Sequence, residues 1–332
     1  MESLKDKAVL ILIENKGKNC DFFNISSYDD LFETLSSFVL LERLDDARKV
    51  LDYICKFQTK KGDFQFKRLV KSGNFDAGRK NPIVFLKVLN DYFQKVNNKK
   101  EVTRVSKQIK RSISYLDDSF DKNFILFYEQ DKLGLKKFSA YDNTLFLSFA
   151  EEFSDILNEY NLNKEADKIY IFKTKVELGC QRYFFNRDEK VIIEWFKPEV
   201  FKYKIAKDVK LPQIFLNYDF NNISIEKEVL KHIKVDIKNE TNFEYILLIL
   251  LYLKLKKDKD YLKLYENYKK YMFYFPKKLV SEKNYNAKIK KSLFVEFKED
   301  VKKFEKEKMI LISLNQLKIA NLVLRLEKEN RE

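Results

Sequence analysis

The chain has 332 residues, of which 45% are hydrophobic, with 30 Phe and 19 Tyr, so it can bury a sizeable core and is not expected to be disordered. Its 6 Gly and 4 Pro are too few for an all-β architecture with frequent turns. The net charge of +14 would suit an anionic partner, but Lys and Arg are interspersed with Asp and Glu, which favours ordinary solvated helix faces.

Apolar residues recur at helical spacing along most of the chain, which predicts about a dozen helices. The expected helices cover residues 4–15, 29–43, 45–57, 82–96, 101–116, 140–160, 164–183, 224–233, 242–255, 260–273 and 309–326. Two runs are instead typical of strands. They are the aromatic run 124–128, which ends in Glu129, and residues 191–196, which belong to a short β-like excursion at about 187–223.

Short and long connections alternate between these helices. The short ones lie at residues 44, 97–100, 161–163 and 256–259, and the long ones at 16–28, 58–81, 117–139, 184–223 and 274–305. Short turns join antiparallel helical hairpins, and hairpins repeated around a ring bring every long loop to one face. An open array of the tetratricopeptide or HEAT type is the alternative, but its loops are short throughout. The spacing therefore favours one all-α domain over 1–332, an (α/α)6 toroid with its long loops on one face.

Cysteine and histidine usage restricts the chemistry. Cys20, Cys55 and Cys180 are far apart with no CxxC pair, which disfavours a disulfide framework and a zinc site and suits a reduced compartment. His232, the only histidine, has no Ser or Cys partner near it in sequence, which argues against Ser-His and Cys-His catalysis. The apolar run 8–13 is too short to span a membrane. We expect a cytoplasmic protein with no cofactor, no metal and no membrane partner.

Six segments, taken in order, are similar to motifs of one family. They are Tyr28-Asp29-Asp30, Glu42-Arg43-Leu44-Asp45-Asp46-Ala47-Arg48, Gln58-Thr59-Lys60-Lys61-Gly62-Asp63-Phe64, Phe127-Tyr128-Glu129, Ser139-Ala140-Tyr141-Asp142-Asn143 and Leu279-Val280-Ser281-Glu282-Lys283. Their order resembles the glucoamylase family of glycoside hydrolases, family 15, whose fold is a six-hairpin α/α toroid. The resemblance covers nearly the whole chain, without the family's N-terminal β domain. It implies that Glu129 is the general acid, that Glu282 is the general base, and that the substrates are α-linked gluco-oligosaccharides.

Inverting hydrolysis of a glycosidic bond uses two carboxyl groups about 6.5–9.5 Å apart, one to protonate the leaving oxygen and one to activate water. The acid needs a raised pKa, which an aromatic and poorly solvated setting supplies. Glu129 follows an aromatic run and suits the acid, whereas Glu282 lies in a polar loop and suits the base. Either can instead be an ordinary surface residue, since the chain has 51 acidic side chains.

Further residues beside the long loops are predicted to contact the sugar: Tyr28, Asp29, Asp30, Arg79, Asn81, Tyr128, Tyr141 and Asp142. Asp29, Asp30 and Asp142 precede helices, where a carboxylate also serves as an N-cap, so capping is an alternative role. Trp195, the only tryptophan, is expected in the core or at its rim rather than as a sugar platform.

Three functions stay open at this point. The leading hypothesis is a glycosidase with an oligosaccharide substrate. The second is a toroid that has lost catalysis and binds a glycan or a protein partner. The third, which the interspersed charges disfavour, is a basic helical scaffold that contacts nucleic acid. The sequence predicts no oligomeric state.

Overall fold

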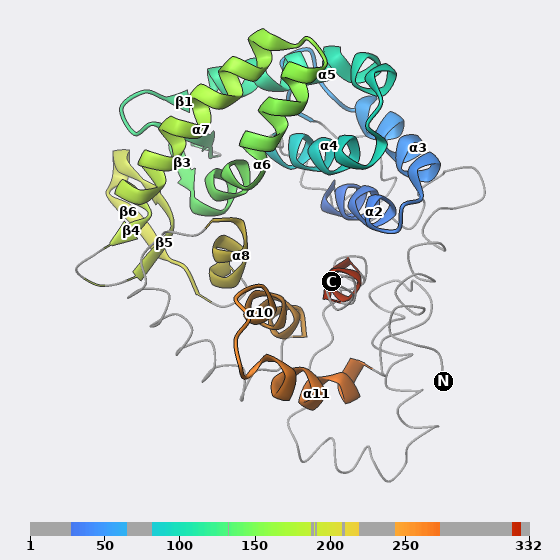
Figure 1. The fold of residues 1–332 in the computed structure, drawn as a ribbon. Helices are drawn as coiled ribbons and strands as arrows, with labels where there is room; N and C mark the ends of the chain where they lie inside the picture. Colours follow the sequence, from blue (N-terminus) through green and yellow to red (C-terminus); the bar gives the residue numbers. More distant parts are fainter. Residues whose placement is uncertain are drawn as a thin grey trace, which may run out of the picture. The chain divides into compact units, whose positions relative to one another are not determined.

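The computed structural model of the protein describes residues 28–64, 82–131, 133–186, 189, 191–207, 210–218, 243–272 and 321–326. Helices predominate among them, accompanied by one region of strands (Figure 1). The contacts divide the chain into two compact units, one of Met1–Leu41 with Lys227–Glu332 and one of Glu42–Glu226. Each unit is described by itself, and the single closed toroid over 1–332 stays a prediction.

The helices of the Glu42–Glu226 unit form an inner and an outer row. They are α3 (Leu44–Cys55), α4 (Ile83–Val96), α5 (Lys99–Asp118), α6 (Ala140–Glu159), α7 (Asn163–Tyr183) and α8 (Lys210–Asn217). Helix α6 packs against α4, α7 and α8, and it is apolar around most of its circumference. Helices α5 and α7 each bury a narrower stripe. The inner row is therefore α4, α6 and α8, with α5 and α7 packed outside it.

Two tight turns make helical hairpins of α4 with α5 and of α6 with α7. Asn97, at the end of α4, has a left-handed φ of 40°, and the side chain of Asn98 caps α5 by accepting from the Lys100 N–H at 2.9 Å. Asn161, between α6 and α7, has a φ of 64°. Asparagine adopts this conformation more readily than most residues, which explains its use at both turns. The predicted short turns at these two places are confirmed.

The strands of two separate connections form one antiparallel sheet in the order β1-β2-β3-β5-β4, with β6 paired to β5. They are β1 (Phe120–Asp121), β2 (Leu126–Gln130), β3 (Lys136–Ser139), β4 (Phe185–Asn186), β5 (Val191–Lys197) and β6 (Lys202–Ile205), with a 3-10 helix η1 (Pro198–Val200) between the last two. The predicted strand at 191–196 is confirmed as part of β5. The predicted strand at 124–128 is confirmed for residues 126–128, which belong to β2, whereas Phe124 and Ile125 lie in the turn before it. The predicted all-α class describes the helices but not these connections. The backbone N–H and C=O groups of the connections are paired with one another in this sheet.

One face of the sheet belongs to the aromatic core of this unit. Phe138 of β3 stacks on Phe196 of β5 with ring centroids 4.8 Å apart. Phe124 contacts both rings, and Tyr183 at the end of α7 contacts Phe124 and Phe196. Aromatic pairs of this kind contribute about 0.5–1.5 kcal/mol each beyond the area they bury. The sheet is therefore fixed to the end of helix α7.

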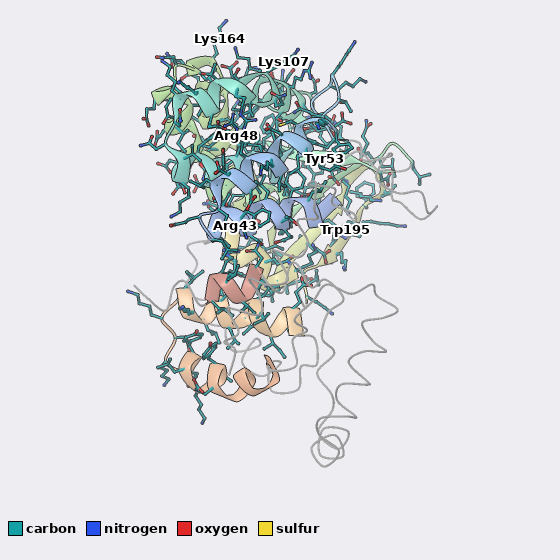
Figure 2. The ribbon with its side chains drawn as sticks, turned by 90° about the vertical axis from the view of Figure 1, so that its right-hand side faces the viewer. Arg43, Arg48, Tyr53, Lys107, Lys164 and Trp195 are labelled. Carbon is teal, nitrogen blue, oxygen red and sulfur yellow. The ribbon has the colours of Figure 1, made fainter. Side chains whose placement is uncertain are left out.

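Positive charge is spread over this unit, and carboxylates pair with part of it. Figure 2 shows Lys107 on α5 and Lys164 on α7, which lie apart from Trp195 on the sheet. Other cations are paired, such as Lys168 with Asp117 at 2.6 Å. The described residues thus present dispersed charge, in line with the interspersed pattern of the sequence.

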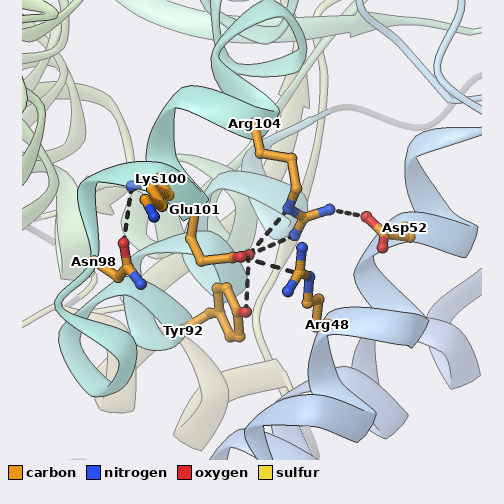
Figure 3. A network of polar contacts seen from close by, with 7 residues as sticks. All are labelled: Arg48, Asp52, Tyr92, Asn98, Lys100, Glu101 and Arg104. Carbon is orange, nitrogen blue, oxygen red and sulfur yellow. Dashed lines mark hydrogen bonds and ion pairs between the residues drawn. The ribbon is translucent and has the colours of Figure 1, made fainter.

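A buried carboxylate joins α3, α4 and α5 (Figure 3). Glu101 accepts hydrogen bonds from the Tyr92 hydroxyl at 3.1 Å and from Arg104 Nη2 at 2.8 Å, and it lies 3.4 Å from Arg48 Nε. Arg104 also forms an ion pair with Asp52 of α3. Burial, followed by the charge of Glu101, raises the pKa of Tyr92, so the phenol remains a donor to Glu101. This network fixes the angle between three helices.

The second unit contains α2 (Tyr28–Leu40), α10 (Phe243–Leu255), α11 (Tyr261–Met272) and a helical segment at 321–326. Helix α10 is buried from Tyr245 to Leu253, so it lies at the centre of this unit's core. Its Lys254 ammonium donates to the Leu326 carbonyl at 2.6 Å, and Asn321 donates to Glu33 at 2.6 Å. In the described part of the chain, no helix combines the length and apolar character that crossing a membrane requires.

The helix boundaries agree closely with those predicted from periodicity, with no start or end displaced by more than about three residues in the described helices. The predicted helices 4–15 and 224–233 lie outside the described residues, as does most of 309–326. The sequence pattern does not predict helix α8, because Pro212 is typical of an irregular stretch. Proline is tolerated within the first turn of a helix, where its missing N–H would have no partner, and Pro212 is the third residue of α8.

Candidate active site

Glu129, the predicted general acid, lies on strand β2 directly opposite Lys137 of β3. Both side chains are half-buried. The register pairs Tyr128 with Phe138, and Ser139 with Trp195 of β5. Since side chains alternate across a strand, Glu129, Lys137 and Trp195 share one face of the sheet. We call this the Glu129 face.

Tyr128 lies on the opposite face, with the aromatic core. Its ring centroid is 6.0 Å from that of Phe138, and Lys136 Nζ lies 4.8 Å from the ring centroid. Tyr128 is therefore adjacent to Glu129 along the chain but is not brought to the same face. Its predicted contact with substrate stays a prediction, and it would have to be made from the other side of β2.

The backbone of β2 is held at its start by the side chain of Asn143, from the first turns of α6. The Phe127 N–H donates to Asn143 Oδ1 at 2.9 Å, and Asn143 Nδ2 donates to the Phe127 carbonyl at 3.0 Å. The same nitrogen donates to the Ser139 carbonyl at 2.9 Å. Strand β3 ends at Ser139, so the carboxamide continues the ladder with the pair of hydrogen bonds that another strand residue would make. Asn143 is fully buried.

The turn between β1 and β2 is fixed by Asp121. Its carboxylate accepts from the N–H groups of Asn123 at 2.8 Å and Phe124 at 3.1 Å and from Lys136 Nζ at 2.6 Å. Burial raises the pKa of Asp121, but the hydrogen bonds from Lys136 and from the two N–H groups outweigh burial and leave that pKa below its ordinary value. The carboxylate therefore stays charged and the turn stays closed at neutral pH.

Ile125, the last residue of this turn, has a left-handed φ of 52°, which is rare for a β-branched residue. Gly179 of α7 lies against it, since a Cβ at Gly179 would meet the Ile125 carbonyl oxygen at 2.7 Å and the Leu126 side chain at 2.8 Å. The strand that carries Glu129 is thus constrained from three sides, by α6, by α7 and by the β1–β2 turn.

Tyr141 and Asp142 lie in the first turn of α6, both half-buried. The N-cap of this helix is Ser139, whose hydroxyl oxygen accepts from the Asp142 N–H at 3.3 Å. The capping alternative for Asp142 is therefore wrong, and Asp142 is the third helical residue, where a carboxylate is favoured by the helix dipole. Lys210, the first residue of α8, places its ammonium 4.6 Å from the centroid of the Tyr141 ring.

Trp195 is half-buried and lies at the rim of the sheet rather than in the core. Lys137 Nζ is 5.4 Å and Lys197 Nζ is 5.7 Å from its ring centroid. Lys197 also forms a salt bridge with Asp131 at 2.5 Å, and the hydrogen bond from Lys197 holds the pKa of Asp131 below its ordinary range. Two cations therefore flank the indole, within the distance at which cation–π attraction operates.

Several predicted site residues lie outside the described part of the chain. They are Arg79, Asn81 and Glu282 in full, and the side chains of Tyr28, Asp29 and Asp30. The pairing of Glu129 with Glu282 across a single cup therefore stays a prediction. No group of three His, Cys, Asp or Glu suited to holding a metal ion occurs among the residues that the structure describes.

Sequence reasoning did not single out Asn143 or Lys137. A signal for Asn143 was present, because it shares the buried stripe of α6 with Phe146 and Ala150, and asparagine is disfavoured inside helices unless its amide has a specific task. Lys137 gave no such signal, since a lysine in a polar loop is ordinary. Its position opposite Glu129 follows only from the strand register.

The comparisons with known proteins find similar folds but no similar sequence. No protein-family model and no curated protein matches the sequence. A solved mannosylglycerate hydrolase of glycoside hydrolase family 63 from Thermus thermophilus matches with a TM-score of 0.56 at 8% identity, over 91% of this chain and 92% of that chain.

Two other solved structures match to a similar extent. An uncharacterized conserved protein from Thermus thermophilus gives a TM-score of 0.60 at 8% identity, over 98% of this chain and 99% of that one. An alpha-amylase from Clostridium perfringens gives 0.55 at 14% identity, over 90% and 85%. At such identities the likeness concerns the fold alone. The predicted likeness to glycosidase folds is confirmed at that level, while membership of the glucoamylase family stays a prediction.

Proposed function

We propose that the protein is a glycoside hydrolase that cleaves α-linked gluco-oligosaccharides with inversion, with Glu129 as general acid and Glu282 as general base. The likeness of nearly the whole fold to a family 63 hydrolase and to an alpha-amylase supports the reaction class. The observation that carries the proposal is the setting of Glu129. It is a half-buried carboxylate on the same face of the sheet as a rim tryptophan, on a strand whose backbone is fixed from three sides.

A fixed strand matters because a general acid has to meet the leaving oxygen at hydrogen-bond distance, and preorganised groups lose little free energy in reaching that geometry. Asn143 and Asp121 hold the two ends of the segment that leads into Glu129. In the proposed reaction Glu129 donates its proton to the glycosidic oxygen, and Glu282 removes a proton from water on the opposite side of the sugar ring. A cytoplasmic location is part of the proposal, since Cys55 and Cys180 are both free thiols.

Sugar release from maltotriose, measured between pH 4 and pH 8, tests the proposal. We expect Glu129→Gln to lower the rate by about 10²–10⁴-fold, the range that general acid–base catalysis contributes. The matched control is Glu194→Gln, which removes the charge of another glutamate of the same sheet, ion-paired to Lys204 at 2.7 Å. NMR of the first product should show the inverted anomer. Unchanged hydrolysis by Glu129→Gln, beside an active control, would show that another residue is the acid.

A second candidate, glycan binding without catalysis, is favoured by one observation. Lys137 lies directly across from Glu129, and a nearby cation favours the charged form of a carboxyl group, whereas a general acid has to be protonated. If this candidate is correct, maltotriose binds the wild-type protein in calorimetry, but no glucose is released at any pH. Release of glucose that depends on Glu129 would exclude it.

A further inference from the structure

The outward face of helix α7 differs from that of its neighbour α5. Both belong to the outer row, have nearly the same length at 21 and 20 residues, and bury one stripe of side chains. Every exposed position of α5 holds Lys, Thr, Ser or Asp. On α7, by contrast, three large apolar side chains are exposed, Tyr170 to 56%, Ile171 to 49% and Leu178 to 57%. Solvation alone explains the outer face of α5 but not that of α7.

The exposed apolar side chains of α7 belong to one stripe. Asp167, Ile171, Thr174 and Leu178 follow one another at intervals of three or four residues, so they lie on one side of the helix, and all four are exposed. The residues that α7 buries lie on the opposite side. We call these four residues, with Arg182 one turn after Leu178, the α7 stripe.

The α7 stripe is apolar in its middle and charged at its ends. Asp167 is at the start, and Arg182, whose guanidinium lies 5.3 Å from the centroid of the Tyr183 ring, is exposed at the end. An apolar centre within a polar rim is the usual composition of a protein–protein interface. Because the charges at the two ends have opposite signs, the stripe is complementary to itself when two copies run antiparallel.

We propose that α7 is the contact of a weak homodimer, in which the α7 stripes of two copies pack antiparallel about a two-fold axis near Thr174. In this arrangement Ile171 of one copy faces Leu178 of the other, and Asp167 faces Arg182. The two-fold axis repeats each of these contacts. The inference goes beyond the proposed function and does not depend on it, because it concerns association of the chain and not chemistry at Glu129.

The size of the stripe sets the strength of the dimer. From Asp167 to Arg182 the helix rises about 22 Å. A single pair of helices in contact over this length buries less than the ~1,200 Å² at which stable interfaces begin. We therefore expect a dissociation constant of about 10–100 µM. The charged ends contribute orientation more than affinity, since exposed ion pairs stabilise little.

Sedimentation equilibrium of the full chain in a reducing buffer, from about 5 to 300 µM, measures this association. The wild type should fit a monomer–dimer equilibrium. Leu178→Glu should weaken the dimer about tenfold or more, because the two-fold axis makes it bury two carboxylates among apolar groups. The matched control is Leu262→Glu on α11, where a leucine is 70% exposed, and it should leave the dissociation constant within about twofold of wild type.

Charge exchange tests the antiparallel orientation. Asp167→Arg and Arg182→Asp each place like charges opposite one another, so each should weaken the dimer about threefold or more. The double variant restores both pairs with their signs exchanged and should bind within about twofold of wild type. A parallel pair would set like charges together in the wild type and would not show this recovery.

A monomer over the whole concentration range would overturn the inference and leave the α7 stripe to another protein or to a lipid surface. A dimer that Leu178→Glu does not weaken, or that Leu262→Glu weakens equally, would overturn it too. A double charge variant no tighter than the single ones would exclude the antiparallel contact. Circular dichroism checks that each variant is folded, and Ile171→Glu takes the place of Leu178→Glu if the latter is not.

Discussion

Replacing Asn143 by alanine should release strand β2 from helix α6. The side chain makes three hydrogen bonds, two of them with the backbone of Phe127, which is 1% exposed, and one with the Ser139 carbonyl. The Ser139 carbonyl lies at the start of α6, where it can still accept a helical hydrogen bond. The N–H and C=O of Phe127 would both lose the Asn143 amide as their partner.

The cost can be estimated from these two groups. An unsatisfied buried polar group costs about 1–3 kcal/mol, so two of them cost about 2–6 kcal/mol. Water entering the space left by the side chain would satisfy part of this demand, and we expect a loss of about 2–4 kcal/mol in the free energy of unfolding. Activity of the proposed hydrolase should fall as well, because Glu129 is two residues further along the same strand.

Equilibrium urea unfolding followed by the emission of Trp195 measures the loss, because Trp195 lies on the same sheet. Thr144→Val is the control. Thr144 is also fully buried on α6, but its hydroxyl donates only to carbonyls of the preceding turn, Ala140 at 2.7 Å and Tyr141 at 3.2 Å. It should cost less than about 1 kcal/mol. A loss for Asn143→Ala no larger than that of the control would refute the view that its amide replaces a strand residue.

Three further changes test other parts of the fold. Gly179→Ala places a methyl group 2.7 Å from the Ile125 carbonyl oxygen, so we expect thermal unfolding to show a loss of about 1–3 kcal/mol, and normal stability would mean that α7 does not press on β2. Glu101→Gln leaves Arg104 without its buried charge partner and should cost about 2–4 kcal/mol in urea, whereas a change under about 0.5 kcal/mol would make the network of Figure 3 incidental. The pKa of Asp121 is below its ordinary value, so its contribution is present at neutral pH and is lost as the pH falls through that lowered value. Wild type and Asp121→Asn should therefore differ by about 1–3 kcal/mol at pH 7 and converge in acid, and a constant difference across pH would contradict the charged role.

Helix positions could be predicted from the sequence because the spacing of apolar residues shows which face of each helix is buried. Helix α6 shows this well, since its buried Phe146, Phe149 and Phe153 recur at helical intervals. The extent of the sheet could not be predicted. Strands β3 and β6 have the sequences KKFS and KYKI, which are only four residues long and rich in lysine.

The candidate site was predicted in part. The aromatic run before Glu129 correctly indicated a strand that ends near a carboxylate. The residues that share its face could not be foreseen, because Lys137 and Trp195 come to that face through strand register, and register depends on pairings between distant segments. The mistaken capping role of Asp142 has a similar origin. Ser139 and Asp142 both suit a helix start, and only the backbone conformation shows that Ser139 precedes the first turn.

The way in which Asn143 closes the ladder has a consequence for the opposite end of the β2–β3 hairpin. There the chain reverses through a loop whose Leu133 is 82% exposed and whose Gly134 has a φ of 78°. The alignment of the two strands is set at the helix end by Asn143 and at this end by Asp131, whose N–H donates to the Leu135 carbonyl at 3.0 Å. We therefore expect residues inserted at the tip, between these two anchors, to leave Glu129 on its face of the sheet. Changing the length of this loop is therefore a way to alter by design which longer or branched ligands the protein contacts, while strand β2 stays unchanged.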